Sequence, residues 1–265
     1  MIYERGSKMK VTLINYTPNA LDTLIFTKNT RLSMHAKLMD EIAAWPMEKK
    51  MAELEYMRNT IASSWEFIDF IFMIEGVSRA FTHQLVRHRA GVAFAQQAQR
   101  AVDMTGFEYI TGPSIKEGSV NEGVYKAAMD NISDAYNELI NSGVNKQDAR
   151  GVLPTNISTN ICFKANLRTL SDMGQTRLCT KSQGEFQDVF RAIREEVLRV
   201  YPWADGFIRV HCAKWGVCKF PTYVGCPVKG MVYNPETGTA YDGSVAAKPD
   251  AIQAAWEVMR GEAQP

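Results

Sequence analysis

The stretch FIDFIFMIEGVSRAFTHQLVRHR, residues 67–89, decides how the chain folds. Phe67–Ile74 is a run of aromatic and β-branched residues, which is typical of a buried strand. Gly76 predicts the end of that strand, and Ser78 can cap the helix that follows. The apolar pattern of that helix reaches the Arg-His-Arg cluster at 87–89, so we expect the cluster at the carboxyl end of the helix.

Further elements are expected on both sides of this stretch. Strand patterns bounded by turn residues occur at Lys10–Tyr16, Phe107–Ile110 and Asn156–Ala165. Helical patterns occur at Ser33–Trp45, at Val124–Leu139 with a stop at Gly143, at Ser182–Val200 and at Asp250–Met259. Strands and helices mix without a regular βαβ rhythm. We therefore predict a single α+β (α/β) domain in which long helices flank a central twisted sheet.

Three sets of apolar residues recur at helical spacing and are expected to pack in the core. The first is Met47, Met51, Leu54 and Met57. The second is Val124, Ala128, Ile132, Ala135 and Leu139. The third is Phe186, Val189, Phe190, Ile193 and Val197.

Composition sets broad limits on function. The chain has 265 residues, of which 46% are hydrophobic and 22% charged, as in an ordinary globular protein. A formal net charge of +1 offers no basic stripe for nucleic acid, and no apolar run reaches the ~18 residues of a membrane span. The first ten residues, MIYERGSKMK, lack the apolar stretch of a signal peptide. We expect a cytoplasmic protein with no nucleic-acid or membrane partner.

The cysteines are expected to be reduced thiols, because there are five of them and the chain is neither small nor secreted. Cys212, Cys218 and Cys226 cluster late in the chain beside His211. They contain no Cys-x-x-Cys pair, and gaps of five and seven residues are unusual for structural zinc. The sequence therefore predicts no metal site.

One polar cluster suggests a nucleotide pocket. It joins Gln84 and the Arg-His-Arg cluster to residues 96–100, QQAQR, on a predicted strand. Glutamine amides can pair with a base edge or a ribose, and guanidinium forks suit phosphate. The helix dipole alone explains cations at a helix end, but it does not explain three glutamines on a strand of low β-propensity. A nucleotide or phosphate pocket is the favoured interpretation.

A second cluster lies beside buried segments and consists of Arg150, Asn166, Arg168 and Arg177. Arginines in such places need partners. The partners can be internal carboxylates, namely Asp148, Asp172 or Glu185, or an anionic ligand. The sequence leaves both alternatives open.

Taken together, these stretches resemble the flavin-dependent thymidylate synthases. The Arg-His-Arg cluster with Arg100 is similar to the family signature, and residues 148–154, DARGVLP, are similar to its second block. Asn166-Leu167-Arg168, Arg177 and residues 183–185, QGE, are similar to its third. The resemblance runs from Lys10 to Cys226. A similarity of this length is far more specific than Arg-His-Arg alone.

The resemblance implies a reaction in which methylenetetrahydrofolate donates one carbon to dUMP and FAD, reduced by NADPH, supplies hydride to give dTMP. It implies a domain at residues 9–226, a C-terminal extension at 227–265, and a homotetramer with sites at its subunit junctions. Arg177 is expected to be catalytic, because a guanidinium against the uracil ring stabilises its anionic form.

The resemblance also implies two sets of binding residues. Those for dUMP are Gln84, Arg87, Gln96, Gln97, Ala98, Gln99, Arg100, Arg150 and Arg177. Those for FAD are Ser63, Glu66, Arg87, His88, Arg89, Gln96, Asn166, Arg168 and Asp172.

The chain also departs from the family pattern. Polar signature positions are replaced by Ala93, Ala95, Gln96 and Ala98, and usual histidines by Ile61, Phe67 and Lys181. Two alternatives therefore stay open. One is a folate-dependent pyrimidine nucleotide hydroxymethylase of the same fold, in which water completes the reaction. The other is a non-catalytic nucleotide- or flavin-binding relative.

Overall fold

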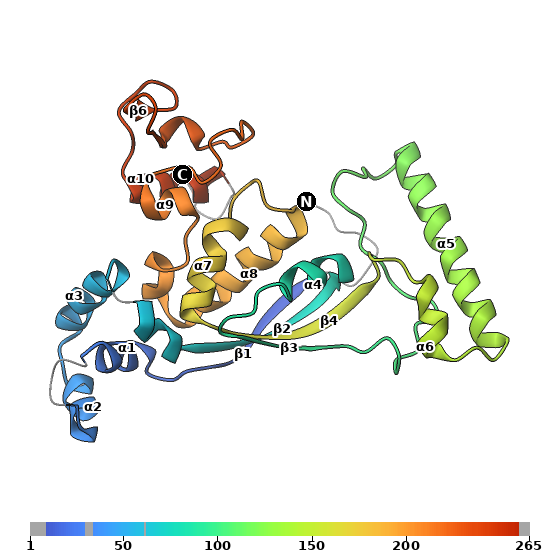
Figure 1. The fold of residues 1–265 in the computed structure, drawn as a ribbon, viewed down its shortest axis with the longest axis horizontal. Coiled ribbons are helices and arrows are strands. Elements are labelled where there is room, and N and C mark those ends of the chain that lie inside the picture. Colours follow the sequence, from blue (N-terminus) through green and yellow to red (C-terminus); the bar gives the residue numbers. More distant parts are fainter. Residues whose placement is uncertain (1–8, 30–33, 61, 260–265) are drawn as a thin grey trace. The chain divides into compact units, whose positions relative to one another are not determined.

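The computed structural model describes residues 9–29, 34–60 and 62–259, and it mixes helices and strands as predicted. The chain divides into two compact units. Among the described residues, the first comprises 9–14 and Ile71–Lys164, and the second comprises the described residues of 15–70 and of 165–259. Figure 1 labels most of the helices and strands of both units.

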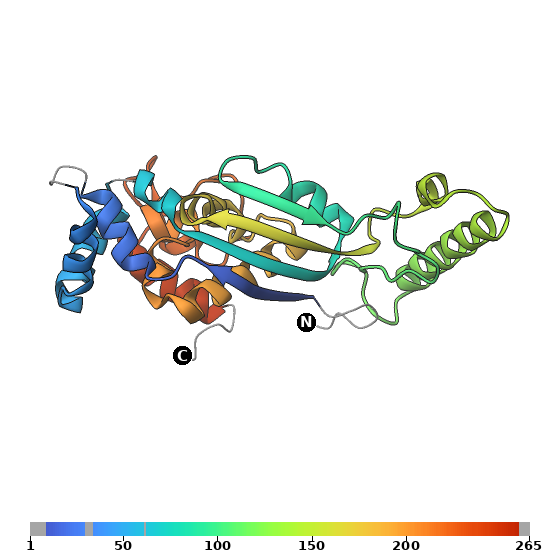
Figure 2. The ribbon, with the colours of Figure 1, turned by 90° about the horizontal axis from the view of Figure 1, so that it is seen from below.

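Four strands form one sheet, in the order β1-β2-β4-β3. They are β1 (Lys10–Tyr16), β2 (Asp69–Ser78), β3 (Val92–Gln96) and β4 (Ser158–Asn166). Figure 2 shows them side by side in this order. The prediction of β1 is confirmed at both ends, and that of β4 begins two residues early and stops one residue short.

An aromatic stack holds the first unit's part of the sheet together. Phe163 of β4 is buried between strands, with its ring centroid 6.2 Å from that of Phe72 on β2 and 5.5 Å from that of Phe94 on β3. Both ring pairs are stacked. Stacked aromatic pairs across neighbouring strands add to the burial energy and fix the strand register.

Two predictions about strands are wrong. Gly76 does not end β2, which continues to Ser78. Gly76 takes φ of 64°, which suits glycine, and its N–H is satisfied by the Asn160 side-chain oxygen at 3.0 Å. The segment Phe107–Ile110 forms no strand; Tyr109 makes a single antiparallel bridge to Ile157.

The remaining elements of the first unit are helical: α4 (Arg79–Leu85), α5 (Val120–Asn141), α6 (Lys146–Ala149) and the 3-10 turn η2 (Arg150–Val152). The long helix α5 and its stop at Gly143, with φ of 84°, are confirmed. Its predicted apolar face is only partly confirmed: Leu139 packs against the core cluster, but Ala128 and Ala135 are exposed. The buried residues of α5 are Met129 and Tyr136, which pack with Met104 and Ile157, whereas Val124 is 67% exposed.

The helices of the second unit begin with α1 (Ala20–Lys28), α2 (Ala36–Ala43), α3 (Met47–Arg58) and the 3-10 turn η1 (Ala62–Phe67). The helix predicted at Ser33–Trp45 is shorter than expected, and its start at Ser33 lies outside the described residues. Leu54 and Met57 are buried as predicted, but Met47 is 62% exposed and Met51 42%. An apolar stripe does not reveal how far along a helix the packing extends.

The second unit continues with α7 (Leu167–Arg177), α8 (Gly184–Val200), η3 (Pro202–Gly206), α9 (His211–Trp215), η4 (Lys229–Met231), the paired strands β5 (Tyr233–Asn234) and β6 (Thr239–Ala240), and α10 (Pro249–Met259). The predicted apolar face of α8 is confirmed, because all five of its members are buried. The helix predicted at Asp250–Met259 is confirmed as α10.

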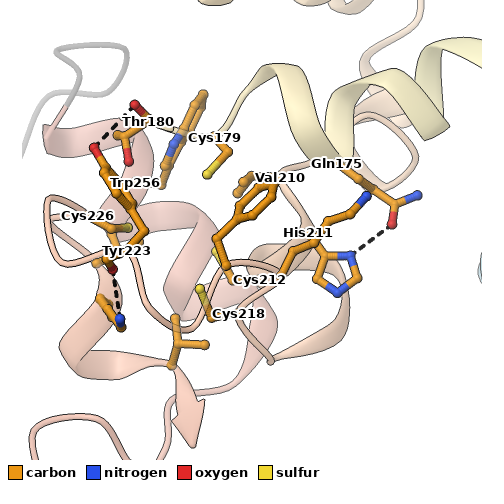
Figure 3. A pocket seen from close by; sticks show the side chains of 15 residues that line it. Gln175, Cys179, Thr180, Val210, His211, Cys212, Cys218, Tyr223, Cys226 and Trp256 are labelled. Atoms are coloured by element: carbon orange, nitrogen blue, oxygen red, sulfur yellow. Dashed lines mark hydrogen bonds between the residues drawn. The ribbon is translucent and has the colours of Figure 1, made fainter. Parts of the chain in front are cut away.

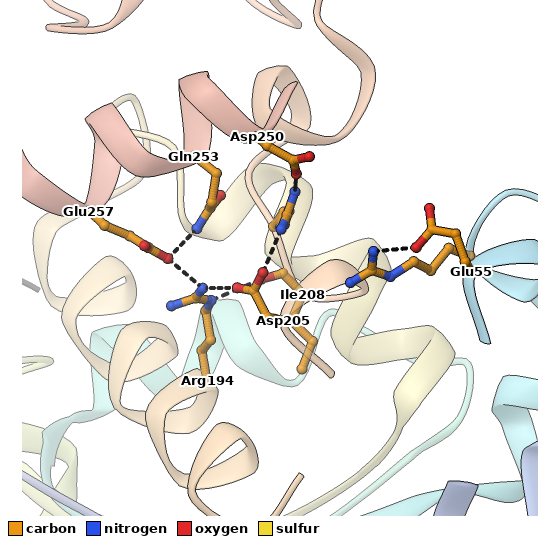
Figure 4. A network of polar contacts seen from close by, with 9 residues as sticks. Glu55, Arg194, Asp205, Ile208, Asp250, Gln253 and Glu257 are labelled. Carbon is orange, nitrogen blue, oxygen red and sulfur yellow. Dashed lines mark hydrogen bonds and ion pairs between the residues drawn. The ribbon is translucent and has the colours of Figure 1, made fainter. Parts of the chain in front are cut away.

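An ion-pair network ties α10 to the rest of the second unit (Figure 4). The buried Arg194 of α8 pairs with Asp205 and, at 2.8 Å, with Glu257 of α10, and it donates to the Ile208 carbonyl at 3.0 Å. Arg209 pairs with Asp205 as well and with Asp250 of α10 at 2.5 Å. Because the Arg194 guanidinium is buried, removing either carboxylate would leave part of its charge unneutralised in the interior and lower the stability of the protein.

We expect Arg194→Ala to lower the free energy of unfolding by about 3 kcal/mol, because two carboxylates lose a buried partner. Denaturant unfolding measures this change. The matched control is Arg199→Ala on the same helix, where the exposed Arg199 pairs with Glu196; its loss should leave stability nearly unchanged. Equal losses in the two variants would contradict a structural role for the network.

Candidate functional site

The Arg-His-Arg cluster follows α4 directly. The Ser78 hydroxyl accepts a hydrogen bond from the Phe81 N–H at 3.0 Å, as predicted, and so fixes where the helix begins. The helix ends at Leu85, and the backbone turns through Arg87. Arg87 and Arg89 are exposed, whereas Gln84 and His88 are half-buried. The predicted position of the cluster at the helix end is confirmed.

A second cation of the first unit, Arg79, lies close to Arg150. Burial lowers the pKa of the half-buried Arg79 guanidinium, and the neighbouring positive charge of Arg150 lowers it further. Arg150 is exposed and donates through Nε to the Gln147 carbonyl at 3.1 Å. Two guanidinium groups that repel one another form a natural binding place for an anion.

Sequence reasoning missed Arg79, although a signal was present. Arg79 is the first residue of α4, where the helix dipole favours acidic side chains over basic ones. A cation in that position is unfavourable for the helix alone. Such a residue is a candidate for ligand binding.

The glutamine segment only partly matches its prediction. Gln96 is the last residue of β3, and residues 97–100 lie beyond the strand rather than on it. The Gln96 amide nitrogen donates to the hydroxyl of Thr82 at 2.9 Å and lies 3.5 Å from that of Thr159. The Gln97 N–H donates to the Asn160 carbonyl at 3.1 Å, and Arg100 is exposed in the turn. The donor side of Gln96 therefore serves the interior of the protein.

The second unit gathers five of the residues expected near the flavin: Ser63, Glu66, Asn166, Arg168 and Asp172. The first two lie on η1 and the last two on α7, and η1 and α7 are in contact. Asn166 caps α7 by accepting from the Thr169 N–H at 2.9 Å. Arg168 pairs with Glu66 at 2.5 Å, so the internal partner of this arginine is not Asp172. Ser63, Glu66, Arg168 and Asp172 are all exposed.

Arg177 is the last residue of α7, and its guanidinium lies 4.1 Å from the centre of the Phe186 ring. Burial lowers the pKa of this guanidinium. An arginine keeps its charge in such surroundings. The aromatic face therefore holds a planar, permanently charged group in a partly desolvated position, where a cation acts most strongly on a developing negative charge.

Lys214 of α9 is a further cation near Asp172 that the sequence did not bring to attention. Its Nζ donates to the Ser171 hydroxyl at 2.7 Å and lies 5.1 Å from the centre of the Trp65 ring. Burial lowers the pKa of Lys214, and the charge of Asp172 opposes that shift. Only the fold brings α9 to α7, because α8 separates them in the sequence.

Two positions at which the chain departs from the resembled family are described in the second unit. Phe67, in place of a histidine, is 60% exposed at the end of η1. Lys181, in place of another, lies with its Nζ 4.5 Å from the centre of the Phe220 ring. Ile61 lies outside the described residues.

The predicted residues divide between the two compact units. The first unit contains Gln84, Arg87, His88, Arg89, the glutamine segment, Arg100 and Arg150. The second unit contains Ser63, Glu66, Asn166, Arg168, Asp172 and Arg177. The chemistry of both sets, in which exposed guanidinium groups accompany hydroxyl, amide and carboxylate groups, is that of a class of proteins that bind phosphorylated, hydrogen-bonding ligands.

Comparison with known proteins identifies the family to which the chain belongs. A model of the thymidylate synthase complementing protein family matches residues 12–203. A flavin-dependent thymidylate synthase from Clostridium tetani is 33% identical over 218 residues, which cover 75% of this chain and 86% of the relative. The same-named protein from Pyrococcus furiosus is 32% identical over 223 residues, 79% of this chain and 89% of the relative. The chain therefore belongs to the thymidylate synthase complementing protein family.

A third relative, the flavin-dependent thymidylate synthase from Geobacter sulfurreducens, is 39% identical over 137 residues, 51% of this chain and 57% of its own. Every residue predicted for either ligand lies between Ser63 and Arg177, inside the segment that the family model matches. Separately, no helix in the described ranges is both long and apolar enough to cross a membrane.

The Gln96 hydrogen bonds lead to a prediction for the ligand-free protein. Gln96→Ala should lower the free energy of unfolding by about 1 kcal/mol, because the buried Thr82 hydroxyl loses a partner. Thermal and denaturant unfolding measure the change. Gln99→Ala, in the turn beyond β3, is the control and should leave stability within about 0.5 kcal/mol. An unchanged Gln96→Ala variant would mean that the amide serves a ligand alone.

Proposed function

We infer that the chain is a flavin-dependent thymidylate synthase, which converts dUMP to dTMP with methylenetetrahydrofolate as the one-carbon donor and FAD as its cofactor. The observation that carries this inference is the family match over residues 12–203, together with relatives of that name that align over most of their length. When bound and reduced, FAD would supply the hydride that completes the new methyl group.

The chain's own residues suit these ligands chemically. Arg87, Arg100 and Arg150 are exposed cations of one unit and are proposed to hold the dUMP phosphate, with Arg79 beside Arg150 as an additional cation. Gln84 and the segment 97–99 are proposed to contact the nucleotide as well. The Oε1 of Gln96 is its proposed contact, because its nitrogen serves Thr82.

For FAD, we propose Ser63, Glu66, Asn166, Arg168 and Asp172 in the second unit, and Arg87, His88, Arg89 and Gln96 in the first. Guanidinium groups suit the diphosphate, and hydroxyl and carboxylate groups suit ribose and the ring system. The Glu66–Arg168 pair is exposed on both sides, so opening it for a ligand costs less than about 1 kcal/mol.

Arg177 is the proposed catalytic residue. Carbon attack from the uracil ring needs electron density at position five, and a guanidinium against the ring carbonyl and imide nitrogen stabilises the anion that provides it. The stack on Phe186 orients the guanidinium before substrate arrives. The ring then loses the proton at position five after the carbon–carbon bond forms.

Four finer features rest on the same resemblance and are proposed with it. They are a domain at residues 9–226 with a C-terminal extension at 227–265, a central twisted sheet with the flavin-dependent thymidylate synthase fold, reduction of FAD by NADPH, and a homotetramer in the cytoplasm.

The central test is Arg177→Ala. We expect turnover to fall about 100-fold or more while FAD still binds with a normal flavin absorption spectrum, because the variant loses charge stabilisation without losing the residues proposed for FAD. Arg177→Lys should restore only part of the rate, since an ammonium lacks the planar fork. Arg199→Ala is the control for removal of an arginine elsewhere in the unit. Wild-type turnover in Arg177→Ala would overturn the assignment.

One observation favours a second candidate, the nucleotide hydroxymethylase: the polar signature positions are Ala93, Ala95 and Ala98 here. Incubation with dUMP, methylenetetrahydrofolate, FAD and NADPH separates the two reactions. We expect a nucleotide with the mass of thymidylate and one NADPH consumed for each product formed. A hydroxymethyl nucleotide formed without NADPH oxidation would exclude the synthase.

A further inference from the structure

Helix α9 carries an exposed tryptophan whose ring is held in place. Trp215 is the last residue of α9 and is 49% exposed. Its indole N–H donates to Oε1 of Gln175 on α7 at 3.1 Å, and His211 Nδ1 lies 3.0 Å from the same oxygen (Figure 3 shows the His211 contact). Because an indole N–H can only donate, the Gln175 atom between the two rings is the oxygen, and His211 Nδ1 donates to it as well. One edge of the Trp215 ring is therefore fixed while much of its surface stays accessible.

Two lysines bring positive charge to this tryptophan. Lys214 Nζ lies 5.5 Å from the centre of the Trp215 ring, and the exposed Lys219 donates to the Thr176 hydroxyl at 3.1 Å. Lys214 also donates to a hydroxyl, that of Ser171, and hydroxyls leave an ammonium charge unneutralised. Asp172 offsets part of the Lys214 charge. We call Trp215, Lys214 and Lys219 the tryptophan–lysine platform.

The imidazole beside the platform adds no charge to it. Burial lowers the pKa of His211, and the positive charges of Lys219 and Lys214 lower it further. His211 is therefore neutral at neutral pH. The two lysines remain as the cations that can attract an anionic ligand to the Trp215 ring.

The platform continues the face of α7 that is proposed to bind FAD. Arg168, Asp172 and Gln175 follow one another at spacings of four and three residues, so they lie along one face of the helix. The first two are proposed FAD residues, and the third anchors Trp215. Both α7 and α9 belong to the second unit and are in contact.

The platform also lies near the proposed catalytic residue. Gln175 and Thr176, which accept from Trp215 and Lys219, directly precede Arg177 at the end of α7. All three fall within one helical turn. A ligand on the platform is thus close to the residue that is proposed to act on the uracil ring.

The reaction requires one ligand at such a place. The one-carbon donor has to meet the uracil ring, because the new carbon–carbon bond joins the two. Methylenetetrahydrofolate contains a planar aminobenzoyl ring that carries glutamate carboxylates directly. A planar ring stacks on an indole, and ammonium groups next to the indole suit carboxylates on a flexible chain. Diphosphates, as in FAD and NADPH, are better matched by the planar fork of arginine.

We propose that the tryptophan–lysine platform binds methylenetetrahydrofolate, with the aminobenzoyl ring stacked on Trp215 and the glutamate carboxylates paired with Lys219 and Lys214. This inference rests on the proposed function, because it assigns residues to one substrate of that reaction. The pterin, which carries the one-carbon unit, then extends toward the end of α7 and Arg177.

The first test is equilibrium binding of tetrahydrofolate, measured by calorimetry, to full-length protein loaded with oxidised FAD and dUMP, in which no turnover occurs. Trp215→Ala should weaken this binding about tenfold or more, because the stacked ring is lost. Trp215→Phe should lose less, since a benzene ring still stacks without the Gln175 anchor. FAD and dUMP should bind to both variants as they bind to the wild-type protein.

The chain offers a matched control for this test. Trp45, in the same unit, also has a lysine over its ring, with Lys49 Nζ 3.3 Å from the ring centre, but it lies between α2 and α3. Trp45→Ala should bind tetrahydrofolate as the wild-type protein does. Denaturant unfolding of each variant separates a loss of binding from a loss of fold.

The second test uses the exposed lysine, whose removal disturbs the fold least. Tetrahydrofolate with three glutamates should bind the wild-type protein more tightly than the form with one glutamate, and Lys219→Gln should reduce this advantage. Added salt should reduce it as well, because attraction between exposed charges is screened. Lys49→Gln is the control and should keep the full advantage.

Three results would overturn the assignment. Normal tetrahydrofolate binding in both Trp215→Ala and Lys219→Gln would exclude the platform from the folate site. A loss confined to NADPH binding in Trp215→Ala, or one confined to FAD binding, would assign the ring to that ligand instead. The proposed function is judged separately, by formation of dTMP in the wild-type protein. If dTMP forms while the platform variants bind tetrahydrofolate normally, only the present inference is wrong.

Discussion

Direct passage from strand to helix, fixed each time by one side-chain cap, is the constraint on which the candidate site depends. At the end of β2 the Ser78 hydroxyl accepts the Phe81 N–H, and at the end of β4 the Asn166 amide oxygen accepts the Thr169 N–H. Each cap sets the residue at which its helix begins, and the helix length then sets where Arg87 and Arg177 stand. Both arginines lie at carboxyl helix ends, where the backbone dipole favours a cation.

Sequence patterns predicted best the elements whose structure follows from their own local pattern of apolar and polar residues. Lys10–Tyr16 alternates as a strand does, and α8 carries a wide apolar face that can only be buried. Gly76 was misleading because a glycine that ends a strand and a glycine that continues it with φ of 64° look the same in a sequence. The predicted burial of Met47 and Val124 was wrong for another reason. The sequence of an amphipathic helix shows which residues form its apolar face, but the residues that cover this face come from distant parts of the chain.

The candidate site was predictable to the extent that its arginines are recognisable in motifs. The contacts that these residues make within the protein could not be predicted from the sequence. Gln96 reads as a ligand-binding amide, yet Thr82 and Thr159 lie beside its nitrogen only because α4 and β4 flank β3. The approach of Arg79 to Arg150 and that of Lys214 to Asp172 are likewise products of tertiary structure. Pairs that are distant in one sequence leave no local pattern to read.

The ion pairs that hold α10 have a consequence for the end of the chain. Glu257, one of the carboxylates that neutralise Arg194, lies in the last turn of α10, only two residues before the helix ends at Met259. A premature stop codon a few triplets upstream of that glutamate would leave a buried guanidinium with half its counter-charge and would loosen the contact between α9 and α10. Natural variants that shorten this protein should therefore spare the glutamate, even though the residues after it carry none of the proposed chemistry.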